Sequence, residues 1–380
     1  MKISLYIHIP FCIKKCLYCD FLSGPYDDKV RFSYVEALVN ELRFKANIYS
    51  GYEVVSIFIG GGTPSVLTND QIMKIMDTIY DCYLISDDAE ITMEVNPGTV
   101  SAKDQVLGYK EANINRVSIG LQSALDSELK LLGRIHSVND FENTYGLFVD
   151  AGFKNLNVDL ISGLPNQKCE NFIQSLRYVT TLGDEIKHIS AYGLIIEEGT
   201  PFYEKYGENK ESIESINEDV DRKIYKITQD MLSAAGFIQY EISNYSKNGY
   251  DCKHNIRYWR RENYIGFGIG AASLFNNVRW SNTSDINKYI LNNGICEEEE
   301  LIKLSVNDQM EEFMFLGLRM KDGVSVRDFY SYFKQDMPDK YMNIIDKYIN
   351  MSMLKRNKDR IMLTDEGINV SNTIMSEFLF

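Results

Sequence analysis

The chain has 380 residues, of which 44% are hydrophobic, which is enough for one large barrel and a smaller domain. Its formal net charge of −14 at pH 7 argues against a broad phosphate-binding surface, so we expect no nucleic-acid partner. A run of four glutamates at residues 297–300 adds to this charge and is typical of a solvated turn.

The chain opens with a strand-like run at residues 3–9, which lacks the basic segment, long apolar core and cleavage site of a signal peptide. No stretch approaches the roughly 18 consecutive apolar residues of a membrane helix. We therefore expect a cytoplasmic protein. There the cysteines stay reduced, and clustered cysteines indicate metal ligands before disulfides.

Strand-like and helical patterns alternate through the first half of the chain. The strand-like runs are residues 3–9, 54–60, 90–96, 116–121, 155–161 and 188–194. About six β–α units of this kind predict a parallel sheet, either open and doubly wound or closed into a barrel. In both architectures the functional groups gather at the C-terminal ends of the strands.

Two of the intervening helices have clear signals. Residues 32–46 place apolar side chains at helical spacing on one face, namely Phe32, Val35, Leu38, Leu42 and Ala46. The next helix opens with Thr68 and Gln71 at the spacing of a capping box.

The alternation stops after residues 199–201. A long helix is predicted at residues 215–235, then a strand-like run at 237–242 and a glycine-rich stretch at 266–270. From about Ser305 the pattern becomes helices, a short β element at 360–364 and a final helix, which indicates a separate small domain.

Three cysteines follow the first strand. Cys12, Cys16 and Cys19 have the spacing C-x3-C-x2-C, and three thiolates on one short loop can bind three irons of a cubane and leave the fourth iron open. A structural zinc site would need four ligands, usually in two pairs, and three unrelated buried cysteines are the other alternative. The remaining cysteines are scattered and are typical of ordinary core or surface thiols: Cys82, Cys169, Cys252 and Cys296.

The segment from Tyr6 to Cys19 resembles the radical S-adenosylmethionine (SAM) superfamily. In detail it is similar to the branch that contains oxygen-independent coproporphyrinogen III oxidase (HemN) and the haem chaperones of the HemW family. The resemblance implies a [4Fe–4S] cluster on the three cysteines, whose open iron binds SAM, and an electron that cleaves SAM to a 5′-deoxyadenosyl radical.

The resemblance also implies an α/β fold built on an incomplete (β/α)6 TIM-like barrel. We expect this barrel, with the cluster and SAM site, at residues 1–205 and a connecting region at residues 206–304. A small helical domain similar to a winged helix, of the HemN C-terminal type, is expected at residues 305–380.

A glycine-rich turn, residues 60–64, follows the second strand. Glycines let backbone N–H groups approach a carboxylate closely, and the turn matches the branch's motif for the methionyl part of SAM. The resemblance assigns the SAM site to Tyr6, Tyr18, Gly61, Gly62, Thr63, Glu94, Gln122, Arg134, Asp159 and Ala191. Alternatively, Glu94 and Asp159 are buried partners of Arg116 or Arg134, since a carboxylate inside a parallel strand is costly unless paired or liganded.

The chain has four histidines, of which His8, His136 and His188 are interpreted as structural or as neighbours of the SAM pocket. His254 lies in residues 253–259, which match the H-N-x-x-Y-W motif of the HemW family. The resemblance implies that His254 serves haem, and the alternative is a satisfied structural histidine.

Two further features favour the haem chaperones over the oxidases of this branch. Oxidases of the HemN type carry a fourth cysteine two residues after the third, where this chain has Phe21, and they carry an extension before the first strand. The C-terminal run at residues 316–324 also matches the branch.

We therefore expect a haem chaperone that binds haem and delivers it to haem-requiring respiratory proteins, with transient contact with the inner membrane face. The resemblance permits a homodimer. The alternative is an enzyme that decarboxylates coproporphyrinogen III oxidatively, and a more distant one is an enzyme acting on another tetrapyrrole.

Overall fold

Six parallel strands form the centre of the protein. The computed structural model describes residues 1–207 and 218–380. The strands lie side by side in chain order: β1 (Lys2–Ile9), β2 (Glu53–Gly61), β3 (Leu84–Val95), β4 (Arg116–Gln122), β5 (Leu156–Ser162) and β6 (Ile186–Gly193). Within the described residues β1 and β6 do not pair, so the barrel is incomplete, as predicted.

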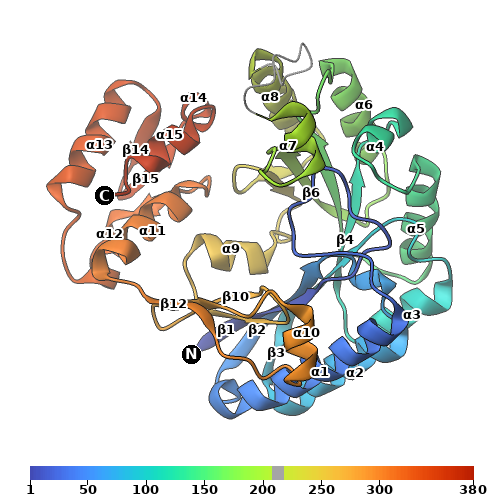
Figure 1. Ribbon diagram of the computed structural model, residues 1–380. Helices are drawn as coiled ribbons and strands as arrows, with labels where there is room; N and C mark the ends of the chain where they lie inside the picture. The colour runs from blue at the N-terminus through green and yellow to red at the C-terminus, as the bar shows by residue number, and fades with distance from the viewer. Residues whose placement is uncertain (208–217) are drawn as a thin grey trace.

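Helices connect these strands and cover the outside of the sheet (Figure 1). They are α1 (Asp28–Tyr49), η1 (Pro64–Val66), α2 (Asn69–Cys82), α3 (Lys103–Glu111), α4 (Asp126–Leu131), α5 (Val138–Asp150) and α6 (Cys169–Thr180). The capping box of Thr68 and Gln71 is confirmed at the start of α2. The expectation that Phe32 shares the buried face of α1 is wrong: it is 61% exposed, because it lies at the edge of the apolar stripe near the helix start, where solvent reaches it.

The region after the barrel extends the sheet at both edges. Its elements are α7 (Pro201–Tyr206), α8 (Glu218–Ala234), β7 (Ile238–Gln239), β8 (Asn244–Ser246), α9 (Lys253–Trp259), β9 (Tyr264–Phe267), β10 (Ala272–Phe275), β11 (Val278–Ser281), α10 (Ile286–Leu291) and β12 (Glu299–Lys303). Strand β9 pairs parallel with β1 and leads to β10, β11 and β12, while β8 and β7 continue the sheet beyond β6.

Three expectations in this region need adjustment. The predicted helix at 215–235 is α8, and residues 215–217 lie outside the described part of the chain. The predicted strand at 237–242 is only two residues long, because Tyr240 turns inward and its hydroxyl lies 2.9 Å from His188 Nε2. Residues 299 and 300 are not a turn but begin edge strand β12.

The strands alternate between an apolar and a polar face. On β1, Ile3, Leu5 and Ile7 are fully buried in the core between sheet and helices. The intervening Ser4 and Tyr6 make polar contacts on the other face, where Ser4 Oγ accepts a hydrogen bond from Ser56 Oγ at 2.7 Å. Because side chains alternate along a strand, this second face is the interior of the barrel, and it is lined with polar groups.

The C-terminal residues form a lobe beside the barrel, drawn in orange and red in Figure 1. It comprises α11 (Val306–Leu318), β13 (Val324–Ser325), α12 (Val326–Phe333), α13 (Asp339–Asn350), β14 (Leu354–Asn357), β15 (Arg360–Leu363), α14 (Asp365–Ile368) and α15 (Ser371–Ser376). The strands pair in the order β13-β15-β14, and the lobe has its own apolar core. The single final helix expected here is two short helices. Among the described residues, no helix is long and apolar enough to cross a membrane.

One glycine of this lobe predicts a measurable loss of stability. Gly323 has φ +62°, and a Cβ there would lie 1.9 Å from the carbonyl oxygen of Ile361. Gly249 has φ +83°, but a Cβ there would meet nothing within 4 Å. We expect Gly323→Ala to lower the free energy of unfolding by about 3 kcal/mol, and Gly249→Ala by only about 1 kcal/mol from backbone strain. Chemical denaturation followed by circular dichroism measures both, and equal losses would contradict the packing argument.

Candidate cluster and SAM site

The loop between β1 and α1 carries the three cysteines. Cys12, Cys16 and Cys19 are half-buried and free of disulfide bonds. Two backbone hydrogen bonds close the base of the loop: Cys12 N donates to Gly24 O at 2.9 Å, and Gly24 N donates to Pro10 O at 2.9 Å. We call residues 10–24 the cluster loop.

Polar groups from neighbouring parts of the chain surround the thiols. Arg134 Nη1 lies 3.5 Å from Cys16 Sγ and Thr63 Oγ1 lies 3.5 Å from Cys12 Sγ, so a cation and a hydroxyl face the sulfur atoms. Among the described residues, no three or more His, Cys, Asp or Glu side chains converge as the ligands of one metal ion do. A cubane presents a separate iron to each thiolate and does not need such convergence.

The glycine-rich turn at the end of β2 has its N–H groups hydrogen-bonded within the protein, and the assignment of Gly61, Gly62 and Thr63 to the SAM site stays a prediction. Gly61 N donates to Glu94 Oε2 at 3.0 Å, and Gly62 N donates to Ile9 O at 2.9 Å. Thr63 N donates to Phe11 O at 2.7 Å. Glycine is required at residue 62 because a Cβ there would lie 2.8 Å from the carbonyl oxygen of Ile9. The turn therefore holds the cluster loop, and its N–H groups are not free to cradle a ligand.

Two carboxylates face the barrel interior from neighbouring parts of the sheet. Both Glu94 and Asp159 are half-buried. Asp159 accepts hydrogen bonds from Ser118 Oγ at 3.0 Å and Asn157 Nδ2 at 2.7 Å. Burial, with the nearby Asp159, raises the pKa of Glu94 to about 7, and burial also raises the pKa of Asp159.

Neither carboxylate forms an ion pair with Arg116 or Arg134 in the part of the chain that the structure describes. Arg116 nevertheless acts on both carboxylates electrostatically and opposes the rise in their pKa values, so they have a buried cation nearby but none in contact. Two half-buried carboxylates without a paired cation suit a cationic ligand group, such as the amine of SAM.

Arg134 joins the ends of several strands. Its Nη2 donates to Gly120 O at 2.8 Å and to the side-chain oxygen of Asn96, whose Nδ2 donates to Thr63 Oγ1 at 3.2 Å. Gln122 ends β4 with φ +70°, a left-handed conformation that non-glycine residues adopt at a cost and that recurs at functional sites. Asn96 was missed as a site residue, although it stands two residues after Glu94 in the same strand-end motif.

Tyr6 and Tyr18 lie at this end of the barrel, whereas Ala191 does not present its side chain there. Tyr6 OH lies 3.0 Å from His8 Nδ1. The ring of Tyr18 packs edge-on against the ring of Phe202, with the two centroids 6.4 Å apart. The side chain of Ala191 packs instead against the core between sheet and helices. The reason is strand alternation, since its neighbour Ser190 is the residue that faces inward.

His254 is far from the cysteines along the barrel. It is 1% exposed, with Nδ1 2.9 Å from Ser56 Oγ and Nε2 2.9 Å from Tyr258 OH. Ser56 pairs with Ser4, which precedes the end of β1 by five residues, or about 16 Å of strand. Burial, reinforced by nearby arginines, lowers the pKa of His254 to about 3, so the ring is neutral but both nitrogens are occupied.

Comparisons with known proteins agree with this geometry. Residues 6–179 match the radical SAM superfamily and residues 304–370 match the HemN C-terminal domain. The chain is 33% identical to the haem chaperone HemW of Lactococcus lactis, over 99% of this chain and 97% of that protein. It is 42% identical to HemW of Escherichia coli over 71% of this chain and 69% of that protein. The chain belongs to the HemW family of radical SAM proteins.

The fold of this HemW-family protein is also that of a solved oxidase. Coproporphyrinogen III oxidase (HemN) from E. coli superposes with a TM-score of 0.84 at 20% identity, over 99% of this chain and 89% of the oxidase. At this identity the likeness shows the fold. Membership of the radical SAM superfamily implies a [4Fe–4S] cluster and SAM, and the cluster loop and the interior carboxylates fit both groups.

The first prediction for this site concerns the cluster. Anaerobic reconstitution with iron and sulfide should load one [4Fe–4S] cluster per chain, and Ala at Cys12, Cys16 and Cys19 should abolish it, because each thiolate binds one iron. Cys296→Ala, outside the loop, is the control and should load normally. A colourless protein that keeps zinc in the presence of iron and sulfide would contradict the assignment.

The second prediction concerns Glu94 and pH. Because its folded pKa is about 7, Glu94 is increasingly protonated below pH 7 and loses its attraction for an amine. SAM affinity should therefore fall by up to tenfold per unit below pH 7 and level off above pH 8. Glu94→Gln should bind more weakly and lose this component of the pH profile.

Anaerobic calorimetry from pH 5.5 to 8.5 measures both profiles. The difference between parent and variant isolates Glu94 from Asp159, Tyr6 and Arg116, which also act on this carboxylate. Parallel profiles would remove Glu94 from the SAM site.

Proposed function

We propose that this protein is a haem chaperone, which binds haem and delivers it to haem-requiring proteins such as respiratory enzymes. The observation that carries the proposal is full-length similarity. Proteins named haem chaperone HemW from L. lactis and Bacillus subtilis are each 33% identical to the chain over 99% of its length. In this role the protein works in the cytoplasm with transient contact at the inner membrane face, as a monomer or homodimer.

The barrel supplies the redox part of this proposal. Cys12, Cys16 and Cys19 would hold the cluster, which supplies one-electron reduction of SAM when both are bound. Glu94 and Asp159 would bind the cationic parts of SAM. Arg134 orients the strand ends around them through Gly120 and Asn96. The strands separate the polar interior of the barrel from the apolar core under the helices, so the reacting groups do not contact that core.

Haem ligation by His254 requires a rearrangement. In the structure described here the ring is sealed between Ser56, Tyr258 and the ring of Phe58, whose centroid lies 5.2 Å away. We propose that α9 moves when haem binds, which frees one ring nitrogen for the iron. Imidazole nitrogen is a common haem ligand, and the position of His254 within the family's motif supports this role.

A second candidate function is oxidative decarboxylation of coproporphyrinogen III, and the shared fold with HemN favours it. Phe21 argues against this function. It is 62% exposed and occupies the position where HemN-type oxidases carry a fourth cysteine. A side chain without a thiol cannot take that residue's place, so chaperoning is the better conclusion.

The test of the function combines haem transfer with turnover. The protein should bind up to one haem per chain and pass it to the apo form of a haem-requiring respiratory protein, and it should not convert coproporphyrinogen III with cluster, SAM and reductant present. Absorption spectra and anaerobic chromatography measure these outcomes. Several turnovers per chain would make the oxidase the correct function.

The role of His254 is tested by a matched pair. His254→Ala should shift or abolish the Soret band. His188→Ala is the control, since His188 is equally buried and has both nitrogens engaged, by Asn157 at 2.6 Å and Tyr240 at 2.9 Å. If both variants lose haem equally, His254 is a structural residue.

A further inference from the structure

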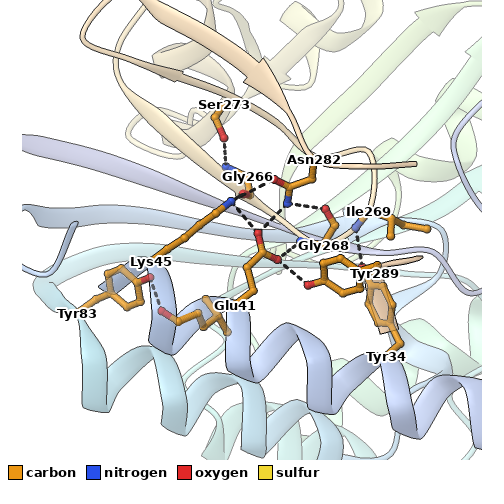
Figure 2. A network of polar contacts seen from close by, with 11 residues as sticks. Tyr34, Glu41, Lys45, Tyr83, Gly266, Gly268, Ile269, Ser273, Asn282 and Tyr289 are labelled. Carbon is orange, nitrogen blue, oxygen red and sulfur yellow. Dashed lines mark hydrogen bonds and ion pairs between the residues drawn. The ribbon is translucent and has the colours of Figure 1, made fainter. Parts of the chain in front are cut away.

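A buried polar network lies beneath the cluster loop, outside the cluster and SAM residues. Figure 2 shows Glu41 and Lys45 of α1 facing the glycine-rich segment at residues 266–271, which the functional assignments above leave unexplained. Glu41 is 1% exposed, and its Oε1 lies 2.7 Å from Lys45 Nζ. We call residues 266–271 the glycine segment.

Glu41 accepts hydrogen bonds from three separate segments of the chain. Its Oε2 accepts from Gly268 N at 2.8 Å and Tyr289 OH at 2.6 Å, and its Oε1 accepts from Asn282 Nδ2 at 2.7 Å (Figure 2). Lys45 Nζ in turn donates to Gly266 O at 3.3 Å. A buried carboxylate with this many donors and a paired cation fixes the backbone that it contacts.

The glycine segment is held against the end of β1, which leads into the cluster loop, and against the far end of the loop itself. Tyr34 OH donates to His8 O at 2.7 Å, at the end of β1, and accepts from Ile269 N at 3.2 Å. At the other end, a Cβ on Gly270 would lie 2.7 Å from Leu22 Cδ2, so the segment packs directly on the loop. His8 Nε2 lies 2.8 Å from Leu22 O and joins the two ends.

We propose that Tyr34 and Glu41 are positioning residues for the iron–sulfur cluster, acting through the glycine segment on the cluster loop. Neither residue is among the residues assigned to the cluster or SAM. Small displacements of the thiolates change the fit of the cubane and of SAM on its open iron, because about 1 Å of misplacement is enough to lower rates a hundredfold. The proposal rests on the cluster assignment of the three cysteines and is independent of haem delivery.

The test uses Tyr34→Phe with Tyr83→Phe as its control. Tyr83 is also a buried tyrosine, and its hydroxyl donates to Leu42 O of α1 at 2.8 Å (Figure 2). Its ring packs edge-on against Phe267 of the glycine segment, with the centroids 6.1 Å apart, and Tyr83→Phe keeps this ring contact. Each variant removes one buried hydroxyl, which makes two hydrogen bonds in Tyr34 and one in Tyr83. Only Tyr34→Phe removes the bridge between His8 and Ile269.

Reconstituted full-length proteins are compared by iron release to a chelator, by the EPR spectrum of the reduced cluster with and without SAM, and by chemical denaturation. Tyr34→Phe should release iron about fivefold faster and broaden the SAM-dependent EPR signal, because the two hydrogen bonds that join His8 and Ile269 are lost. Tyr83→Phe should change denaturation alone. Glu41→Gln, if it folds, should exceed Tyr34→Phe because it leaves Lys45 without its counter-charge.

Equal iron release and unchanged EPR spectra in Tyr34→Phe and Tyr83→Phe would overturn the proposal. A parent protein that loads no cluster would overturn the cluster assignment and the positioning proposal with it. A parent that loads the cluster but binds no haem would contradict only the proposed function.

Discussion

The backbone contact between the end of β2 and the start of the cluster loop is the constraint on which the site depends. Gly62 N donates to Ile9 O, and a side chain at residue 62 would collide with the same carbonyl. This contact fixes where the chain leaves β1, and therefore where Cys12 begins the loop. The glycine segment supports the loop from the opposite side through Tyr34. The cysteines thus lie on a loop that is anchored from two strands, β2 and β9.

The polar interior of the barrel has different roles at the two ends of its strands. At the C-terminal ends, Glu94 and Asp159 lie near the cluster loop and can meet a cationic ligand. At the N-terminal ends, Arg116 is 2% exposed, and Glu90 accepts from Lys253 N at 3.0 Å and so binds the start of α9. The same alternation of apolar and polar residues along each strand therefore builds both the site and a sealed floor.

Much of this arrangement could be predicted from the sequence, because hydrophobic alternation and cysteine spacing are local signals. The six barrel strands and the cluster loop follow from them directly. The role of residue 62 could not be predicted, since a glycine kept for close packing and one kept for ligand binding have the same sequence pattern. Glu41 could be predicted only in part: Lys45 lies four residues away, but the other donors come from residues 227 to 248 positions away, and only the folded chain brings them together. Asn96 was not predicted either, because the site was assigned to the carboxylate of Glu94 in the same motif.

The position of α9 determines what haem ligation by His254 would demand. On the barrel side, Glu90 accepts from His254 N at 3.1 Å. On the lobe side, Arg260, which follows α9, donates to both carboxylate oxygens of Asp322 at 2.5 and 2.6 Å, and Arg319 lies over the ring of Trp259 at 4.4 Å. A helix of seven residues cannot rotate His254 toward a ligand and keep all of these contacts. Haem ligation by His254 would therefore be coupled to the position of the C-terminal lobe. The haem-free and haem-ligated states would differ by the energy of these contacts.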